Sequence, residues 1–494
     1  MHRLSFFLFG AFFCVAWSVG APPSALAREF DFGPLISRRE DVHGVTRLQV
    51  LGPFFERAVD DEGQSLTAVR PLVSRYEHPD VERYGMDIVW PLAHHKGFRD
   101  ERRTRVLLAY YTRFDVNDPE SPYRLRILPV YFQGRDREGE TYRAVFPLGG
   151  TIHDILGQDR VFFVLFPIYG RAEINDITSH NVLWPFIARA TGDDVYRFRI
   201  FPFYGQSRYR DHHNKKFIMW PFWSSAEWMY PTSQGSGYIL FPIYGRIDLT
   251  DQQSWLFLPP FFRISQGTRQ NAWLLPWPFF QRRTGEVNQT YVWPIAGQKR
   301  VPGVETRFFL WPLVHQERVE RGDRISHRLY VLPFYYSDVH RERDDAPPPR
   351  APDQPVPRGT MVSNYQKIWP LVSYRRQGDE ARFRMLDLWP LQQSAPIERN
   401  YAPFWTLIQN TRIEDRSDTE ILWGLYRREV RGEERTYTSL FPLVEWEREQ
   451  TDSGERRRWA LLKGLLGMEQ DDTRRQYQAL YFLRWGGRDR ENLP

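Results

Sequence analysis

Tyrosine and arginine residues that follow a repeated Phe-Pro pair are the side chains of this sequence best suited to hold a ligand. Tyr-Gly-Arg follows Phe-Pro-Ile twice, and Tyr-Gly follows Phe-Pro-Phe once. Aromatic rings beside guanidinium groups can stack on sugars or bind anionic headgroups. The alternative is that the tyrosines only pack and the glycines only permit turns. On the binding interpretation we predict one rim that binds envelope polysaccharide, lipid headgroups or another envelope protein, composed of Tyr169, Arg171, Tyr204, Tyr244 and Arg246.

Other candidate sites in the sequence are weaker. His94-His95 and His212-His213 could be metal ligands, but neighbouring strand residues point to opposite faces, so surface positions beside turns are favoured. The segment 115–120 begins like a calcium loop, yet Pro119 occupies a ligand position, which is typical of a plain turn. The sequence has no nucleophile elbow, phosphate loop or His-Glu-x-x-His motif. We therefore predict a non-enzymatic protein without metal or cofactor. A hydrolase acting on an envelope polymer is the alternative, for which no carboxylate pair can be named.

The elements that must position these residues are set by an internal repeat. A phrase of an aromatic residue or Leu, then Pro, then two apolar residues recurs about every 19 residues, and the first seven steps from Pro53 to Pro185 alternate between 18 and 20 residues. Such alternation indicates an up-and-down meander with a hairpin repeat of about 38 residues. The polar turns between phrases are too short for parallel crossovers, so the strands are expected to be antiparallel. Because proline cannot donate to a sheet ladder, we expect each strand to be bulged or bent at its proline, so that each unit behaves as two short strand halves joined at a corner.

The apolar phrases also bear on how such an array closes. Stretches such as 217–223 and 238–244 are apolar on both faces of an assumed strand, which predicts strands buried on both faces, with the Trp of each Trp-Pro pair in the core. A sheet of about 20 strand units should curl, split or close. We therefore predict an all-β, antiparallel repeat array that is closed or stacked and propeller-like or toroidal. A large outer-membrane β-barrel is the alternative, although an apolar band of about 16 Å is short of the ~25 Å that lipid demands.

The sequence also indicates where the chain goes. Residues 1–27 have the layout of a secretory signal ending in Ala25-Leu26-Ala27, and the only cysteine, Cys14, lies within it. We divide the rest into one all-β domain, 28–485, with a Pro-rich loop insertion at 341–361, and a polar tail, 486–494. The net charge of +6, with both signs interspersed, does not indicate a nucleic-acid partner. We predict an exported protein of the periplasm or outer membrane that acts as a binding or assembly scaffold through its loop rim; an outer-membrane channel or exporter is the alternative.

Overall fold

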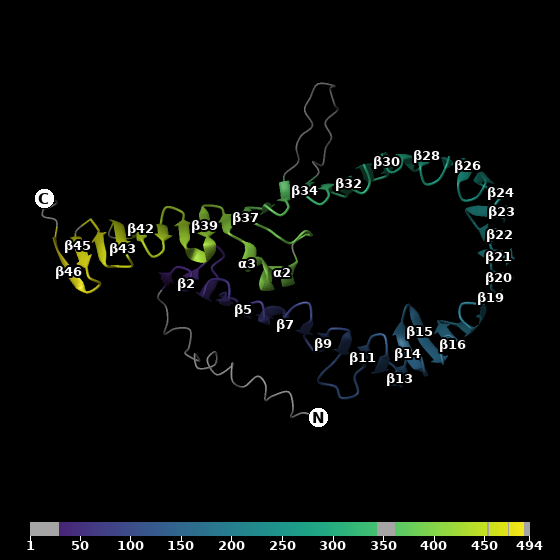
Figure 1. The fold of residues 1–494 in the computed structure, drawn as a ribbon, viewed down its shortest axis with the longest axis horizontal. Coiled ribbons are helices and arrows are strands. Elements are labelled where there is room, and N and C mark those ends of the chain that lie inside the picture. Colours follow the sequence, from purple (N-terminus) through teal and green to yellow (C-terminus); the bar gives the residue numbers. More distant parts are fainter. Residues whose placement is uncertain (1–28, 343–360, 393, 452–453, 473, 489–494) are drawn as a thin grey trace, which may run out of the picture.

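The protein is a single antiparallel β-sheet of 46 strands (Figure 1). The computed structural model describes residues 29–342, 361–392, 394–451, 454–472 and 474–488. Each strand pairs with the next strand along the chain, from β1 with β2 to β45 with β46. This confirms the predicted antiparallel repeat array. The predicted signal peptide, residues 343–360 of the predicted insertion and residues 489–494 of the predicted tail lie outside the described residues.

The first 13 strands form the N-terminal limb of the sheet. They are β1 (Phe30–Phe32), β2 (Ile36–Glu40), β3 (Thr46–Val50), β4 (Phe55–Val59), β5 (Ser65–Val69), β6 (Val73–His78), β7 (Arg83–Ile88), β8 (Ala93–Phe98), β9 (Glu101–Val106), β10 (Ala109–Arg113), β11 (Tyr123–Ile127), β12 (Tyr131–Arg135) and β13 (Thr141–Val145), with the 3-10 helix η2 (Pro79–Val81) between β6 and β7.

The next 21 strands form a curved arc (Figure 1). They are β14 (Gly149–Ile155), β15 (Gln158–Val164), β16 (Tyr169–Ile174), β17 (Ile177–Val182), β18 (Ile187–Thr191), β19 (Val195–Ile200), β20 (Tyr204–Tyr209), β21 (His213–Ile218), β22 (Trp223–Tyr230), β23 (Ser233–Leu240), β24 (Tyr244–Leu249), β25 (Gln252–Phe257), β26 (Phe262–Gly267), β27 (Gln270–Leu274), β28 (Phe280–Gly285), β29 (Asn288–Val292), β30 (Ala296–Val301), β31 (Val304–Phe309), β32 (Val314–Arg321), β33 (Arg324–Val331) and β34 (Tyr335–Glu342).

The last 12 strands return toward the N-terminal limb and run past it. They are β35 (Met361–Ile368), β36 (Val372–Gln377), β37 (Glu380–Met385), β38 (Ile408–Ile413), β39 (Arg416–Ile421), β40 (Tyr426–Arg431), β41 (Arg435–Leu440), β42 (Val444–Thr451), β43 (Gly454–Leu461), β44 (Leu466–Gln470), β45 (Arg474–Ala479) and β46 (Leu483–Arg488), with α2 (Ala395–Asn400) and α3 (Ala402–Trp405) between β37 and β38 and the 3-10 helix η3 (Leu422–Gly424) between β39 and β40.

The repeated prolines lie in the turns between strands, so the predicted bulge within a continuing strand is wrong. The two short segments expected on either side of each proline are present, but as separate strands joined by a chain reversal. Pro185, for example, lies in the turn between β17 and β18, and most of the repeated prolines follow a cis peptide bond, the arrangement of a type VI turn. A proline that has no N–H to donate to the ladder is accommodated where the chain reverses. Each repeat of about 19 residues therefore holds two short strands, which gives a hairpin half as long as predicted and 46 strands in place of about 20.

Most large apolar side chains near the prolines are exposed, which corrects the prediction of strands buried on both faces. The side chains of Trp184, Trp220 and Trp311 are each 52% exposed, so these tryptophans are not core residues. The prediction failed because a segment such as 217–223 is not one strand: it contains the end of β21, a turn and the start of β22. A small buried core does exist around Phe132, Tyr142 and Phe163.

The sheet bends through an open loop, and its two limbs come together near β2 and β39 (Figure 1). Ion pairs link the limbs, for example between Arg39 on β2 and Glu420 on β39, whose side chains approach to 2.5 Å. Among the described strands, β1 and β46 each pair with one neighbour, so strand pairing does not close the loop. No helix among the described residues has the length and apolar composition needed to cross a membrane.

Candidate functional site

The two edges of the sheet differ in chemistry. In an antiparallel meander, successive turns lie at alternate edges, and the turns that hold the repeated prolines all fall at the same edge. We call this the apolar edge. From β3 to β36 it consists of the turns 51–54, 70–72, 89–92, 107–108, 128–130, 146–148, 165–168, 183–186, 201–203, 219–222, 241–243, 258–261, 275–279, 293–295, 310–313, 332–334 and 369–371. These turns contain no acidic residue and a single cation, Arg70, which is buried.

Turns at the opposite edge, which we call the polar edge, are rich in charge. They include the turns 60–64, 99–100, 136–140, 175–176, 192–194, 210–212 and 250–251. Each of these seven turns holds at least one Asp or Glu. The sheet is therefore polarised across its width, with exposed apolar groups at one edge and carboxylates at the other.

The strand register keeps the apolar edge at one level. We number the residues of each strand from this edge as first, second and third row. From β8 to β34, first-row residues pair with one another from strand to strand, as in Tyr169 with Val182 and Ile200 with Tyr204. The exception is β27, which ends one residue short, so that its Leu274 pairs with second-row residues of β26 and β28. The same row continues from Tyr204 through Ile218. Because paired residues lie directly opposite each other, a row that never drifts runs perpendicular to the strands.

Between β8 and β34, acidic residues are excluded from the half of the sheet nearest the apolar edge. From β8 to β34 the first row is entirely apolar or glycine, and the first three rows contain no Asp or Glu. Acids make up 61 of the 494 residues, so their absence from three positions in each of 27 strands is not an effect of composition. Cations are present in the second and third rows, at Arg105, Arg126, Arg143, Arg171, Arg189, Arg199, Lys216, Arg246, Arg263, Arg282 and Arg307.

Second-row residues point to the inside of the loop. Arg427 of β40 is in the second row and forms an ion pair of 2.7 Å with Asp31 of β1, also in the second row, where the two limbs meet. The faces that carry these residues must therefore look toward each other. Side chains of one row share a face across paired strands, so the second row lines the inner face throughout the sheet.

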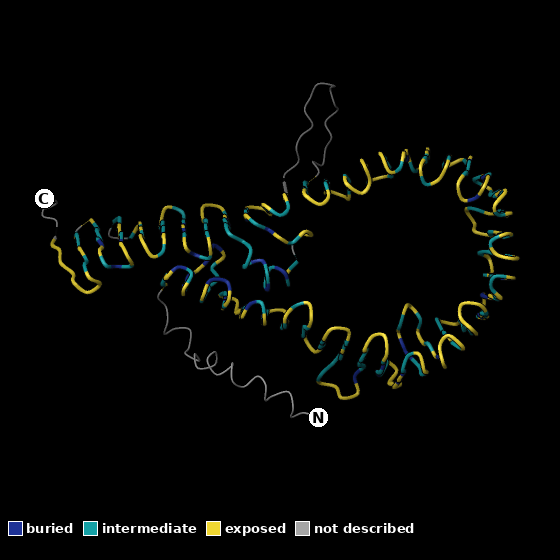
Figure 2. The backbone as a smooth tube through the Cα atoms, viewed as in Figure 1, coloured by how far each residue is buried: buried dark blue, intermediate teal, exposed yellow. Residues whose placement is uncertain are grey.

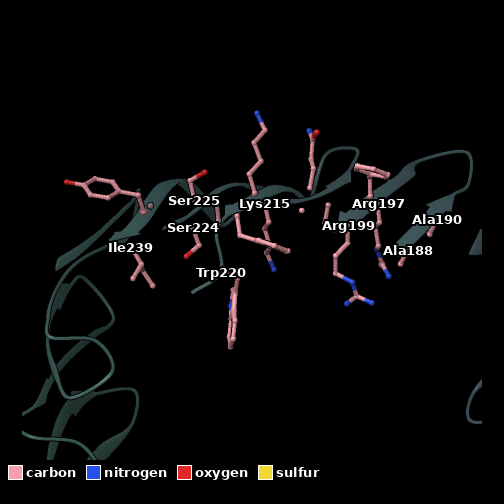
Figure 3. Close-up of a pocket in the computed structure, with 18 of the residues that line it drawn as sticks. Ala188, Ala190, Arg197, Arg199, Lys215, Trp220, Ser224, Ser225 and Ile239 are labelled. Atoms are coloured by element: carbon pink, nitrogen blue, oxygen red, sulfur yellow. The ribbon is translucent and has the colours of Figure 1, made fainter. Parts of the chain in front are cut away.

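A groove of about 630 Å³ lies on this inner face between β17 and β24 (Figure 3). Small residues such as Ala190 and Ser224 leave the space, while Arg197, Arg199 and Lys215 line it. None of the lining residues is acidic. Trp220, which belongs to the apolar edge, projects beyond the strands at one end of the groove (Figure 3). The groove is thus a cationic surface that continues into the apolar edge.

The contact between the limbs is a second polar cluster, which we call the joint. Arg39 pairs with Glu420 at 2.5 Å, and the backbone N–H of Val42 donates to Asp418 at 2.9 Å. Asp418 also pairs with Arg431 at 2.6 Å. These side chains are largely buried, and Figure 2 shows buried residues where the limbs meet. The joint therefore depends on charges that water does not screen well.

The helix α2 extends the joint to β7. Asp87, buried on β7, accepts hydrogen bonds from Arg399 at 2.8 Å and from the Asn400 side chain at 3.0 Å. Arg399 also lies over the ring of Tyr76, 4.0 Å from its centroid. The Arg70 guanidinium donates to the Arg399 carbonyl oxygen. The insertion between β37 and β38 thus fastens the returning strands to the N-terminal limb.

Two buried carboxylates near the joint, Glu56 and Glu420, are held in their charged forms by arginines. Burial opposes ionisation of Glu56, but Arg70 at 2.5 Å and Arg47 at 2.6 Å hold its pKa at about 2. Burial likewise opposes ionisation of Glu420, and Arg39 lowers its pKa below the usual value. Glu429 differs, because burial raises its pKa despite the nearby Arg39. This arrangement is typical of a structural network in which each charge has a partner, rather than of an acid–base pair for catalysis.

The structure places the five predicted binding residues on one face near the apolar edge. Tyr169, Tyr204 and Tyr244 all lie in the first row, and Arg171 and Arg246 lie in the third row of the same face. They do not converge on one point, since three strands lie between each tyrosine and the next. Arg171 pairs with Glu173, and Arg246 pairs with Asp248 at 2.7 Å. The predicted rim is therefore a line of similar positions along the sheet, not a pocket.

Among the described residues, one group has the composition of a metal site: Asp136, Glu140 and His153. Sequence analysis did not single it out, because His153 is remote from the turn that holds the two acids. His153 Nδ1 lies 2.7 Å from Asp136 Oδ2, and the other Asp136 oxygen accepts the backbone N–H groups of Glu138 and Glu140. Burial opposes ionisation of Asp136, but the hydrogen bond with His153 lowers its pKa. These contacts show that the three residues hydrogen-bond with one another and with the backbone of the turn 136–140, which explains their proximity without a metal ion.

Within the described residues, neither histidine pair forms a shared set of metal ligands. His94 and His95 lie in the second and third rows of β8, on opposite faces, and His95 Nδ1 lies 2.8 Å from Thr104 Oγ1. In the segment first compared with a calcium loop, Asp115 accepts the N–H of Asn117 at 2.8 Å, as in an ordinary turn.

Comparison with known proteins gives no assignment. No protein-family model matches the chain, and no curated protein shows significant sequence similarity to it.

Proposed function

We propose that this protein is an exported, non-enzymatic component of a bacterial envelope that acts as a binding or assembly scaffold through the apolar edge of its sheet. The observation that carries the proposal is the separation of chemistry across the sheet: one edge presents exposed Trp, Phe and Leu side chains from successive turns, and the other presents carboxylates. A protein rarely exposes a continuous apolar surface of this kind unless a partner covers it.

We further propose that the joint holds the sheet as a toroid in solution. Its buried ion pairs supply many directional contacts between the limbs, such as Arg427 with Asp31 at 2.7 Å. A toroid would present the apolar edge as a ring with the polar edge above it. Such a shape suits a scaffold that stands on one surface and offers its other rim to further components.

Localisation and processing test this proposal. The full-length chain is produced in a Gram-negative host, and envelope and soluble fractions are separated. We expect the protein in the envelope fraction with Arg28 as its first residue, because the signal layout ends at Ala27. An unprocessed chain that begins at Met1 and stays in the cytoplasm would refute the exported function.

A variant of the apolar edge tests the binding surface in the same host. The combined substitution Trp184→Glu, Trp220→Glu and Trp311→Glu places charges on three side chains that are each 52% exposed. We expect the variant to be processed normally but to move from the envelope to the soluble periplasmic fraction. The matched control is Leu156→Glu, because Leu156 lies in a polar-edge turn and is 92% exposed. Equal retention of the triple variant and this control would refute the role of the edge.

A further inference from the structure

We propose that the apolar edge docks on a lipid bilayer containing anionic lipids and enters only its nearer leaflet. This inference rests on the proposed function, in which the apolar edge is the binding surface, and it names the partner. Four independent properties of the edge support it: its thickness, its backbone conformation, its flanking charges and its level course.

The apolar layer has the thickness of an interfacial segment. It consists of the turn residues and the first row, because cations already occur in the second row, as at Arg126 and Arg199. At a rise of about 3.3 Å per residue, a turn of two residues in depth plus one row spans roughly 10 Å. Interfacial elements bury their apolar face by about 5–10 Å, whereas the hydrocarbon core is about 30 Å thick. The layer therefore fits one leaflet and is too thin to cross both.

Large apolar side chains occupy positions of these turns that local conformation disfavours. The first turn residue is often in the left-handed region, with φ of 46° at Leu183, 47° at Met219 and 47° at Leu310. Glycine and asparagine adopt this conformation most readily, and they are the usual residues there. Polar-edge turns mostly hold polar residues in this conformation, as at Asn175 and Asp211 with φ of 49° and 57°, and Leu156, with φ of 53°, is an exception. At the apolar edge, by contrast, large apolar residues recur in this conformation from turn to turn, and turn formation alone does not explain that recurrence.

The charges behind the apolar layer match an anionic surface. The first three rows from β8 to β34 contain 11 cations and no acid. Arg126, Arg189 and Arg199 form no ion pair within the described part of the chain. Where an edge cation does pair, as Arg246 does with Asp248, the acid lies two residues farther from the edge. Basic residues at this depth attract anionic headgroups, while the carboxylates of the polar edge would face away from the membrane.

The level course of the edge fits a flat surface. Because the register does not drift cumulatively along the arc, with a single one-residue offset at β27, the turns lie at one height. Many turns can therefore touch one plane together, and weak individual contacts add up along the sheet. A protein partner would instead need a surface that follows the whole curve.

Vesicle flotation tests the inference with the purified chain from Arg28 to Pro494. The vesicles are phosphatidylcholine alone or phosphatidylcholine with phosphatidylglycerol. We expect the wild type to float with both and more strongly with the anionic vesicles. The triple variant Trp184→Glu, Trp220→Glu and Trp311→Glu should lose at least about tenfold in partitioning, because interfacial binding scales with buried apolar area. Leu156→Glu, at the polar edge, should float like the wild type.

A second triple variant isolates the charges. Replacing Arg126, Arg189 and Arg199 by glutamine should abolish the preference for anionic vesicles while leaving binding to phosphatidylcholine unchanged. Circular dichroism and unfolding midpoints equal to those of the wild type would establish that the variants are folded. Flotation of the wild type with neither vesicle, or equal flotation of the tryptophan variant and the wild type, would overturn the inference.

Depth is measured by quenching of tryptophan fluorescence with brominated lipids. Bromine near the headgroup should quench more than bromine near the end of the acyl chain, because the edge enters one leaflet. Stronger quenching by the deep bromine would indicate a spanning structure and overturn the inference. A dimer formed through the apolar edges would also overturn the inference, if light scattering detects it in the presence of vesicles and the protein does not float. If flotation fails while the envelope retention described above holds, the proposed scaffold function stands with a partner other than lipid.

Discussion

Removal of the Arg427 charge should open the joint without unfolding the sheet. The Arg427 side chain is 1% exposed and pairs with Asp31 at 2.7 Å and with Glu420 at 3.5 Å. In Arg427→Met, Glu420 keeps Arg39 at 2.5 Å, and Asp31 keeps the Gly33 N–H at 2.8 Å. Breaking a buried ion pair costs about 3–5 kcal/mol, and these remaining partners favour the lower end of that range. A cost of about 3 kcal/mol corresponds to a shift of roughly 150-fold toward the open joint.

Crosslinking across the joint measures this shift. The chain from Arg28 onward has no cysteine, so cysteines at His43 and Glu380 would be unique. These residues belong to different limbs, and His43 Nε2 lies 3.9 Å from Glu380 Oε1. A short bismaleimide should link them much more slowly in Arg427→Met. The control is Arg428→Met, which changes an exposed arginine on the opposite face of the same strand. Equal crosslinking rates in the two variants, with equal unfolding midpoints, would show that Arg427 does not hold the limbs together.

Two further predictions follow from the buried charges and from the glycines. The pKa of Glu56 is lowered to about 2 by Arg70 and Arg47, so its contribution to stability is complete above the unfolded value near 4.5 and is lost as pH falls toward 2. The urea midpoint of unfolding should therefore decline in this pH window, and Glu56→Gln should weaken the decline. Gly205→Ala should lower the stability of the protein by about 1–3 kcal/mol, because the new Cβ would lie 2.1 Å from the Phe217 ring. Gly170→Ala is the control: it has the same Tyr-Gly position but no contact closer than 3.8 Å, so it should change the denaturation midpoint little. Equal effects of the two substitutions would contradict the packing argument.

The class of fold could be predicted from the sequence, but the number of strands could not. Aromatic and β-branched residues beside recurrent prolines favour strands over helices, and short polar turns require antiparallel neighbours. The error came from treating the proline phrase as the centre of a strand. Phe217, Trp220 and Trp223 read as one apolar run, yet a chain reversal separates the first from the last. Periodicity alone does not distinguish an apolar strand from an apolar turn with two strand ends.

Only part of the candidate site could be predicted, again because the proline phrase was treated as the centre of a strand. Tyr169, Tyr204 and Tyr244 were selected as a rim, and they do share one row beside the apolar edge. The stronger signal, exclusion of acids near the proline phrases, could have been read from the sequence by aligning the repeats on their prolines. The joint could not, because Arg39 and Glu420 are separated by 381 residues and no local pattern marks either as a partner of the other.

The repeat, the edge and the joint are physically connected. A sheet whose paired rows never drift has untilted strands, so it curves as a band of constant height instead of winding into a screw. Constant height keeps every proline turn on one level, which is the condition for simultaneous contact with a flat surface. The joint then limits how far the band can open, and thereby sets the circumference that the edge presents. Loosening the joint in Arg427→Met should therefore leave each turn able to bind, while changing the shape of the surface that the edge presents. Charges introduced at Trp184, Trp220 and Trp311 should instead weaken binding while leaving the joint closed.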